Sequence, residues 1–194
     1  MEAVWVALVV FGFLLIVFLV LAFRFPDELK ELLRRTKSVS ITPKGLVLEL
    51  VEKAVEEKEH RKPAPNEVRP VLERIPPQSR VLWVDDAPSN NRLEIQALRA
   101  LDVDVDTATS NDEAVLYATA DGYDLVLSDI GRAPPQESNA GLALPALLHA
   151  AGLEVPIAYY VGHAESPQTP DGHPVFDRPT DLLEFIAETL GDHS

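Results

Sequence analysis

Residues 81–91 read VLWVDDAPSNN, an apolar run that stops at two adjacent carboxylates, Asp85 and Asp86. A buried strand followed by a helix cap would need only one acidic residue at this point. Two like charges side by side repel each other unless a cation compensates them. The stretch therefore leaves two interpretations open, a strand end with a helix cap or a metal site.

The sequence from residue 80 onward alternates apolar runs typical of strands with amphipathic segments typical of helices. This alternation predicts an open parallel sheet with helices on both faces. We expect strands at 80–84, 103–109, 123–129, 155–161 and 174–177, and helices at 89–101, 110–120, 140–151 and 179–190.

Acidic residues stand at the ends of two of these strands. Asp85 and Asp86 end the first strand, and Asp129 ends the third. Ligands of open parallel sheets bind outside the carboxyl ends of the strands, where the strand order switches. If both strands lie at that point, three carboxylates meet at one edge of the sheet. This expectation favours a metal-binding pocket over a simple helix cap.

Three motifs resemble the receiver domain of bacterial response regulators, over about residues 80–190. They are VLWVDDAPSNN, with an Asn near the start of the next helix, YDLVLSD, which ends in Asp129, and FDRP before the last helix. The resemblance implies an α/β fold of the flavodoxin-like (CheY-like) class. That fold is a five-stranded parallel sheet with helices on both faces.

The resemblance also implies a chemistry for these residues. Asp129 would be the phosphoacceptor, attacking the phosphoryl group of a phosphohistidine. Asp85, Asp86 and Asp129 would hold Mg²⁺ together with the backbone carbonyl of Gly131. The implied partner is a histidine kinase or a phosphotransfer protein. The chain is therefore not expected to be an enzyme, beyond phosphorylating itself from a phosphodonor.

The sequence departs from the family pattern at several positions. Val161 stands where the family has Thr or Ser at the end of the fourth strand. Arg178 replaces the family lysine, and no lysine follows Lys62. Arg178 is therefore a candidate permanent counter-ion for Asp129. Only 13 residues separate Val161 from Val175, and three of them are prolines. The fourth helix is expected to be short or absent.

Residues 3–23 contain no charged side chain and are long enough to cross a bilayer as a helix. A cleaved signal peptide would need a basic start, whereas this N-terminus offers only Glu2. The basic residues of 24–37 follow the span and none precedes it. We therefore expect residues 1–25 to be a single-pass anchor in the inner or plasma membrane, with the N-terminus outside and the C-terminal domain cytoplasmic.

The segment between the anchor and the domain is expected to have two parts. Residues 26–62 form a juxtamembrane region in this interpretation. Residues 63–79 contain five prolines and predict a semi-rigid linker, which places the receiver-like domain at 80–194. Within the juxtamembrane region we expect a short helix, a hairpin and a charged helix, at 27–37, 38–50 and 51–62.

The composition excludes several functions. The chain has no cysteine, which rules out disulfides, zinc–thiolate sites and cysteine nucleophiles. Residues 80–194 carry 5 arginines and no lysine against 20 acids, so nucleic acid is not an expected partner. Two hypotheses remain. One is a phosphorelay module phosphorylated on Asp129; the other is a pseudo-receiver that acts, without phosphorylation, as a membrane-tethered adaptor or effector in bacterial signalling or defence.

Overall fold

A computed structural model describes residues 43–131 and 139–191 of the chain. The described residues belong to one compact unit, whose five parallel strands form a sheet in the order β2-β1-β3-β4-β5. This is the strand order of flavodoxin-like folds, as the sequence predicted. The strands are β1 (Arg80–Val84), β2 (Asp104–Ala108), β3 (Leu125–Ser128), β4 (Ile157–Tyr160) and β5 (Val175–Phe176).

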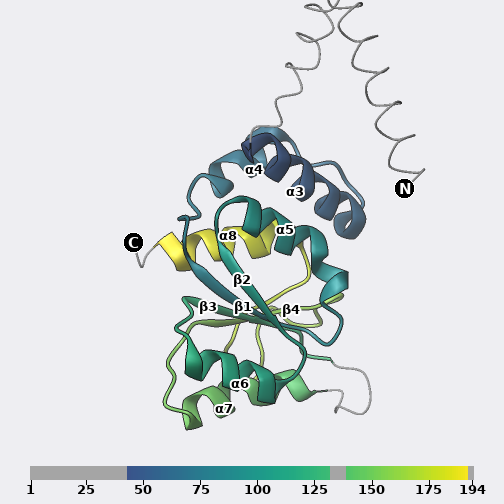
Figure 1. Cartoon of the computed structure of the whole chain (residues 1–194). Coiled ribbons are helices and arrows are strands. Elements are labelled where there is room, and N and C mark those ends of the chain that lie inside the picture. The colour runs from purple at the N-terminus through teal and green to yellow at the C-terminus, as the bar shows by residue number, and fades with distance from the viewer. Residues whose placement is uncertain (1–42, 132–138, 192–194) are drawn as a thin grey trace, which may run out of the picture. The chain divides into compact units, whose positions relative to one another are not determined.

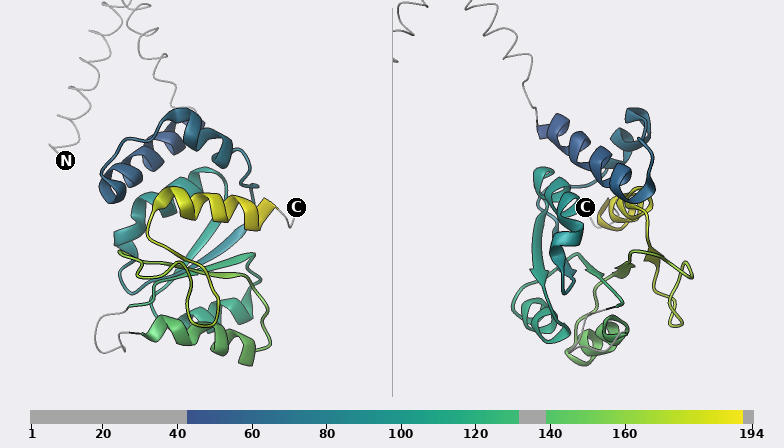
Figure 2. Two further views of the ribbon diagram at one scale, coloured as in Figure 1. Left: turned by 180° about the vertical axis from the view of Figure 1, so that it is seen from behind. Right: turned by 90° about the vertical axis from the view of Figure 1, so that its right-hand side faces the viewer.

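Helices cover both faces of the sheet (Figure 1, Figure 2). Val81 and Trp83 of β1 belong to one apolar cluster, whereas Leu82 and Val84 belong to another. Because successive side chains of a strand point to opposite faces, both faces of β1 are buried, which explains its uninterrupted apolar run. One face carries α5 (Arg92–Ala100) and α8 (Pro179–Gly191), and the other carries α6 (Asn111–Ala120) and α7 (Leu144–Ala150).

Short 3₁₀ turns and caps start several helices close to where the sequence placed them. Turns at Pro88–Asn91 and Ala140–Ala143 lead into α5 and α7. At the start of α6, the Ser110 hydroxyl accepts a hydrogen bond from the Glu113 backbone N–H at 3.2 Å. The Glu113 carboxylate in turn accepts the Thr109 backbone N–H at 2.7 Å. These contacts satisfy donors that the first turn of a helix cannot use internally.

The expected hairpin at residues 38–50 is wrong for its described part. Residues 43–50 begin helix α3, which spans Pro43–Glu59. Val47, Val51 and Val55 recur every four residues on this helix, and each is no more than 1% exposed. They pack against α5 and α8 in the same cluster as Trp83. The helical spacing of these valines outweighs the local alternation of apolar residues that suggested strands.

The proline-rich segment 63–79 is not an extended linker. It contains helix α4 (Pro65–Leu72), which buries Val68 and Leu72 against α3 and α8. Pro65 lies in the first turn, where a helix loses no hydrogen bond to a missing N–H. The helices α3 and α4 therefore form a second layer over α5 and α8, as Figure 1 shows, and the compact unit starts well before residue 80.

The chain between β4 and β5 contains no helix, since all of residues 161–174 are described and none is helical. A single antiparallel bridge pairs Gln168 with Pro174. The Thr169 backbone N–H donates to the His173 carbonyl at 2.9 Å and closes the loop. The prolines of this segment cannot donate to a helical ladder. The prediction of a short or absent fourth helix is confirmed.

No helix in the described ranges is both long and apolar enough to pass through a bilayer. The predicted span at residues 3–23, and the predicted helix at 27–37, lie outside these ranges.

Candidate functional site

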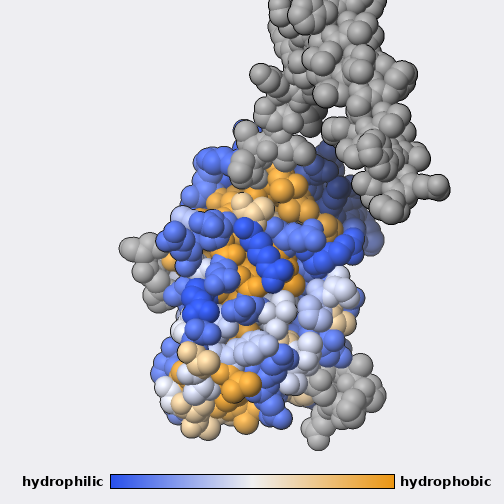
Figure 3. All heavy atoms as spheres, viewed as in Figure 1, coloured by the Kyte–Doolittle hydropathy of each residue, from blue (hydrophilic) through white to orange (hydrophobic). Residues whose placement is uncertain are grey.

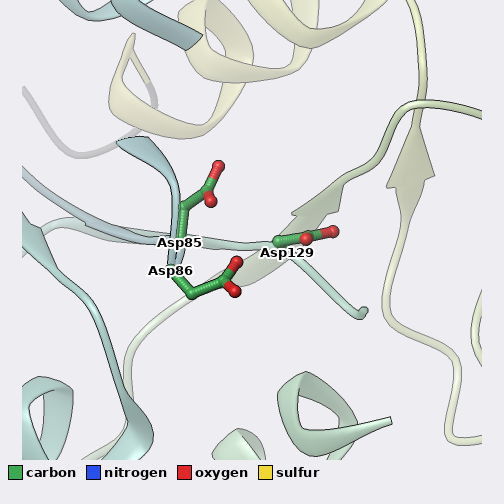
Figure 4. A group of neighbouring side chains, drawn as sticks. All are labelled: Asp85, Asp86 and Asp129. Atoms are coloured by element: carbon green, nitrogen blue, oxygen red, sulfur yellow. The ribbon is translucent and has the colours of Figure 1, made fainter. Parts of the chain in front are cut away.

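The three acidic residues singled out from the sequence lie together. β1 and β3 are parallel neighbours at the point where the strand order switches. The Asp129 backbone N–H donates to the Val84 carbonyl at 2.9 Å, which continues the pairing beyond the strands. One carboxylate oxygen each from Asp85, Asp86 and Asp129 lies within 4.8 Å of the others (Figure 4). The predicted three-carboxylate pocket is therefore present.

Asp85 is the most buried of the three, at 4% exposure. Its Oδ1 accepts the Ala87 backbone N–H at 2.7 Å, and its Oδ2 accepts the Asn91 side-chain amide at 2.5 Å. A buried carboxylate needs such donors to offset its lost hydration. The structure thus shows the polar contacts of Asp85 at the strand end, and the metal site stays a prediction. Asp85 stabilises the turn before α5, and it also faces the other two acids.

The pKa of Asp129 is raised above its ordinary value, mainly because the carboxyl group is partly buried. The negative charge of Asp85 raises it further, and Asp86 adds to the effect. Hydrogen bonds from the Ile130 and Gly131 backbone N–H groups act in the opposite direction without cancelling it. The pocket therefore disfavours a third negative charge, and a bound cation would remove that penalty.

Gly131 contributes to the site through its backbone N–H, which bonds to the Asp129 carboxylate. The prediction concerned its carbonyl as a metal ligand, and that role stays a prediction. The oxygen atoms of three carboxylates form the hard, anionic ligand set that Mg²⁺ prefers. The residues present thus fit a magnesium ion.

Arg178 lies at the start of α8 and contacts acids other than Asp129. Its guanidinium bonds to Glu59 of α3 at 3.0 Å and to Asp181 at 3.4 Å. Glu59, with its side chain 4% exposed, also accepts the Thr180 backbone N–H at 3.2 Å. The described residues contain no ion pair between Arg178 and Asp129, so the expected counter-ion role is not seen. The buried Glu59 carboxylate, which the sequence did not point to, needs this partner instead.

A hollow of about 500 Å³ opens beside Asp129. Val161 lines it, so an apolar side chain stands where the family resemblance implies a hydroxyl. Two hydroxyl residues, Ser166 and Thr169, line the same hollow. Both already donate hydrogen bonds, Ser166 to the Gln168 carbonyl and Thr169 to the Asp171 carboxylate. Neither hydroxyl replaces the missing one without first giving up its bond.

The sequence analysis did not identify Gly141, Asn91 or Lys58 as contributors to the site. Gly141 packs directly on the acidic loop, because a Cβ there would lie 2.0 Å from the Asp129 carbonyl oxygen. Asn91 donates to Asp85, and its Oδ1 accepts from Lys58 of α3 at 2.6 Å. The motif did contain an Asn near the start of the helix, but nothing in it indicated a contact with Lys58.

Comparison with known proteins supports the fold. No family model matches the chain, and no curated protein matches it either. Among solved structures, the response regulator PhyR from Brucella abortus matches with a TM-score of 0.52 and 18% identity, over 66% of this chain and 54% of that one. A mutant of the anti-anti-sigma factor PhyR from Bartonella quintana matches with a TM-score of 0.52 and 17% identity, over 66% and 55%.

A third match is the response regulator TrrA from Thermotoga maritima in complex with Mg²⁺–BeF, with a TM-score of 0.47 and 25% identity, over 58% of this chain and 98% of that one. The present chain spans about half of the length of the two PhyR chains. Its sheet and helices have the fold of response regulator receiver domains. At these identities the likeness concerns the fold alone.

Proposed function

We propose that the chain is a receiver-like signalling module that is phosphorylated on Asp129 in the presence of Mg²⁺. The observation that carries the proposal is the convergence of Asp85, Asp86 and Asp129 at the switch point of the sheet. The raised pKa of Asp129 supports it, because burial and the neighbouring carboxylates disfavour its negative charge, which a cation would compensate. The receiver fold agrees with this function.

Each residue has a defined part in the proposed reaction. An Asp129 carboxylate oxygen attacks the phosphorus of a phosphohistidine, and the P–N bond breaks with its electron pair staying on the nitrogen. The proton already on the other ring nitrogen makes the leaving group a neutral imidazole. The product is an acyl phosphate on Asp129. Asp85 and Asp86 would hold Mg²⁺, which supplies positive charge against the incoming phosphoryl group. The Ile130 and Gly131 backbone N–H groups orient the attacking carboxylate.

Membrane tethering belongs to the same proposal. The charge-free run at 3–23 and the basic residues after it support a single-pass anchor, with the N-terminus outside and the acidic domain in the cytoplasm. A histidine kinase or a phosphotransfer protein would then be the partner. A donor of this kind would meet the acidic pocket at the carboxyl edge of the sheet.

Phosphorylation with acetyl phosphate tests the proposal. The full chain, incubated with acetyl phosphate and Mg²⁺, should gain one phosphoryl group by intact mass spectrometry, and Asp129→Asn should gain none. Asp102→Asn is the matched control, because Asp102 is an exposed acid that precedes β2 at the opposite edge of the sheet. An unmodified wild-type chain in the presence of Mg²⁺ would refute the proposal.

A second function is favoured by Val161 and by the engagement of Arg178 with Glu59. These are the positions where the family carries the residues that respond to the acyl phosphate. In this alternative the domain is a pseudo-receiver, an adaptor or effector that binds a protein in bacterial signalling or defence. Asp129→Asn should then leave recruitment of the partner at its wild-type level. Loss of recruitment in that variant would count against the alternative.

A further inference from the structure

The last turn of α3 reaches the acidic pocket through one intermediate residue. Lys58 donates from Nζ to the Asn91 Oδ1 at 2.6 Å. Asn91 donates from Nδ2 to the Asp85 Oδ2 at 2.5 Å. Asn91 is buried, and it lies between the ammonium group and the carboxylate. A residue of the helical layer that precedes the sheet is thus connected to the most buried acid of the pocket.

The chemistry of the amide gives these two hydrogen bonds a direction. The Asn91 side chain has one end that only accepts hydrogen bonds and one end that only donates them. The Lys58 ammonium only donates, so it requires the amide oxygen to face it. The amide nitrogen must then face Asp85. If the amide turned over, its oxygen would point at the Asp85 carboxylate oxygen and repel it. Lys58 and Asp85 therefore favour the same orientation of the amide, and Lys58 strengthens the one in which Asp85 receives a donor.

Lys58 is itself held in place from several sides. Its Nζ lies 3.0 Å from the Glu94 Oε1 and 4.0 Å from the centre of the Tyr160 ring. The Tyr160 hydroxyl donates to the same Glu94 oxygen at 2.9 Å. Glu94 is 4% exposed. A flexible lysine side chain that is fixed by an ion pair and an aromatic face has already lost its rotamer freedom. It therefore holds Asn91 in the orientation that donates to Asp85.

We infer that Lys58 is a positioning residue for the acidic pocket, acting through Asn91 on Asp85. The inference rests on the proposed function, since it concerns the same magnesium site. A ligand carboxylate binds its cation more tightly when neighbouring hydrogen bonds fix its orientation. The docked helix α3 thus becomes part of the site, although it lies outside the segment that resembles a receiver domain. Cation binding and docking of α3 must then strengthen each other.

Magnesium affinity measured by calorimetry on the full chain tests the inference. Lys58→Met keeps the length of the side chain and removes its donor. It should weaken Mg²⁺ binding by about 10-fold, the lower end of the effect expected when the residue that orients a ligand is lost. Lys53→Met is the matched control, because Lys53 lies on the same helix and donates its hydrogen bond to the exposed Glu49, away from the acidic pocket. Its affinity should equal that of the wild type.

A double-mutant cycle shows whether Lys58 acts through Asn91. In an Asn91→Ala background the amide is gone, so Lys58→Met should cause no further loss of Mg²⁺ affinity. Lys58→Met also leaves the buried Glu94 carboxylate without its cation, which destabilises the fold. The variant Lys58→Met with Glu94→Gln removes that charge. It should regain thermal stability and still bind Mg²⁺ about 10-fold more weakly than the wild type.

The outcomes separate this inference from the proposed function. If the wild-type chain binds no Mg²⁺, the magnesium-dependent function fails, and the inference fails with it. If the wild type binds Mg²⁺ and Lys58→Met binds it equally well, the inference alone is refuted. An additive loss in the Asn91→Ala background would also refute it, because Lys58 would then act by another route. If Lys58→Met with Glu94→Gln regains the wild-type Mg²⁺ affinity, the loss in Lys58→Met comes from the unpaired Glu94 carboxylate. Lys58 would then have a structural role only.

Discussion

The two faces of the sheet carry helices in different ways. α5 and α8 are covered by the second layer, α3 and α4, whereas α6 and α7 have no such layer within the described residues. Leu116 on α6 is 65% exposed and Leu147 on α7 is 41% exposed, and Figure 3 shows apolar surface over these helices. The helices that precede the sheet therefore cover the helices of one face only. On that face, Lys58 of α3 donates to Asn91, and Glu59 of α3 pairs with Arg178.

A charge placed under the second layer should cause the largest loss of stability. Val55 of α3 is 0% exposed, so Val55→Asp buries an unpaired carboxylate. We expect a loss of about 4 kcal/mol or more in the free energy of unfolding, measured by chemical denaturation. Leu116→Asp, the matched change on the uncovered face, should stay within about 0.5 kcal/mol of the wild type. Equal unfolding midpoints for the two variants would show that α3 does not contribute to the stability of the domain.

The uncovered face has its own sensitive point at Gly141. A methyl group there would lie 2.0 Å from the Asp129 carbonyl oxygen, so the backbone must move. We expect Gly141→Ala to lower the free energy of unfolding by about 2–3 kcal/mol. Gly122→Ala is the control, because no atom lies within 4 Å of a Cβ built at that position. If Gly141→Ala unfolds at the wild-type denaturant concentration, the close approach to Asp129 is not a constraint.

The smallest effect is expected at the acidic edge, between the two faces. The raised pKa of Asp129 means that its stabilising contribution is complete below the pKa of the unfolded chain, about 4, and is lost as the pH rises through the folded value. Asp129→Asn avoids this loss. Without Mg²⁺ it should be more stable than the wild type at pH 7, by at most about 1 kcal/mol after solvent screening.

Thermal unfolding in EDTA across a pH series measures this difference. The stability advantage of Asp129→Asn over the wild type should shrink as the pH falls. It should vanish below about pH 4, where the wild-type carboxyl is protonated. A variant that is less stable than the wild type at pH 7 in EDTA would contradict the prediction, since Asp129 would then be stabilised by its surroundings.

The sequence was sufficient for the sheet and for the three acids, and the reason is local. Strands β1, β3 and β4 are apolar runs bounded by polar residues, and the parallel order brings Asp85 and Asp129 to one edge. The layer of α3 and α4 was missed because short-range patterns conflicted. Apolar residues flank a Pro-Lys-Gly turn at 43–45, which suggested a hairpin, and only the spacing of Val47, Val51 and Val55 indicates a helix.

The contacts that complete the site could not be predicted in the same way. Lys58 and Asn91 are 33 residues apart in the chain, and their pairing depends on how α3 packs against α5. No periodicity within one element carries that information. The same holds for Glu59 and Arg178, which are 119 residues apart. Arg178 was assigned to Asp129 from its place in a motif, whereas the buried Glu59 carboxylate that it contacts comes from a different layer.

The length of α3 places its two ends far apart. A helix of 17 residues extends over about 25 Å, and it is stiff along its axis. Lys58 and Glu59 lie at its C-terminal end, where they contact Asn91 and Arg178, while Pro43 lies at the other end. A force that tilts the Pro43 end would rotate the helix on α5 and displace both contacts together. The contacts of Asn91 and Arg178 with α3 therefore depend on the position of the same helix end.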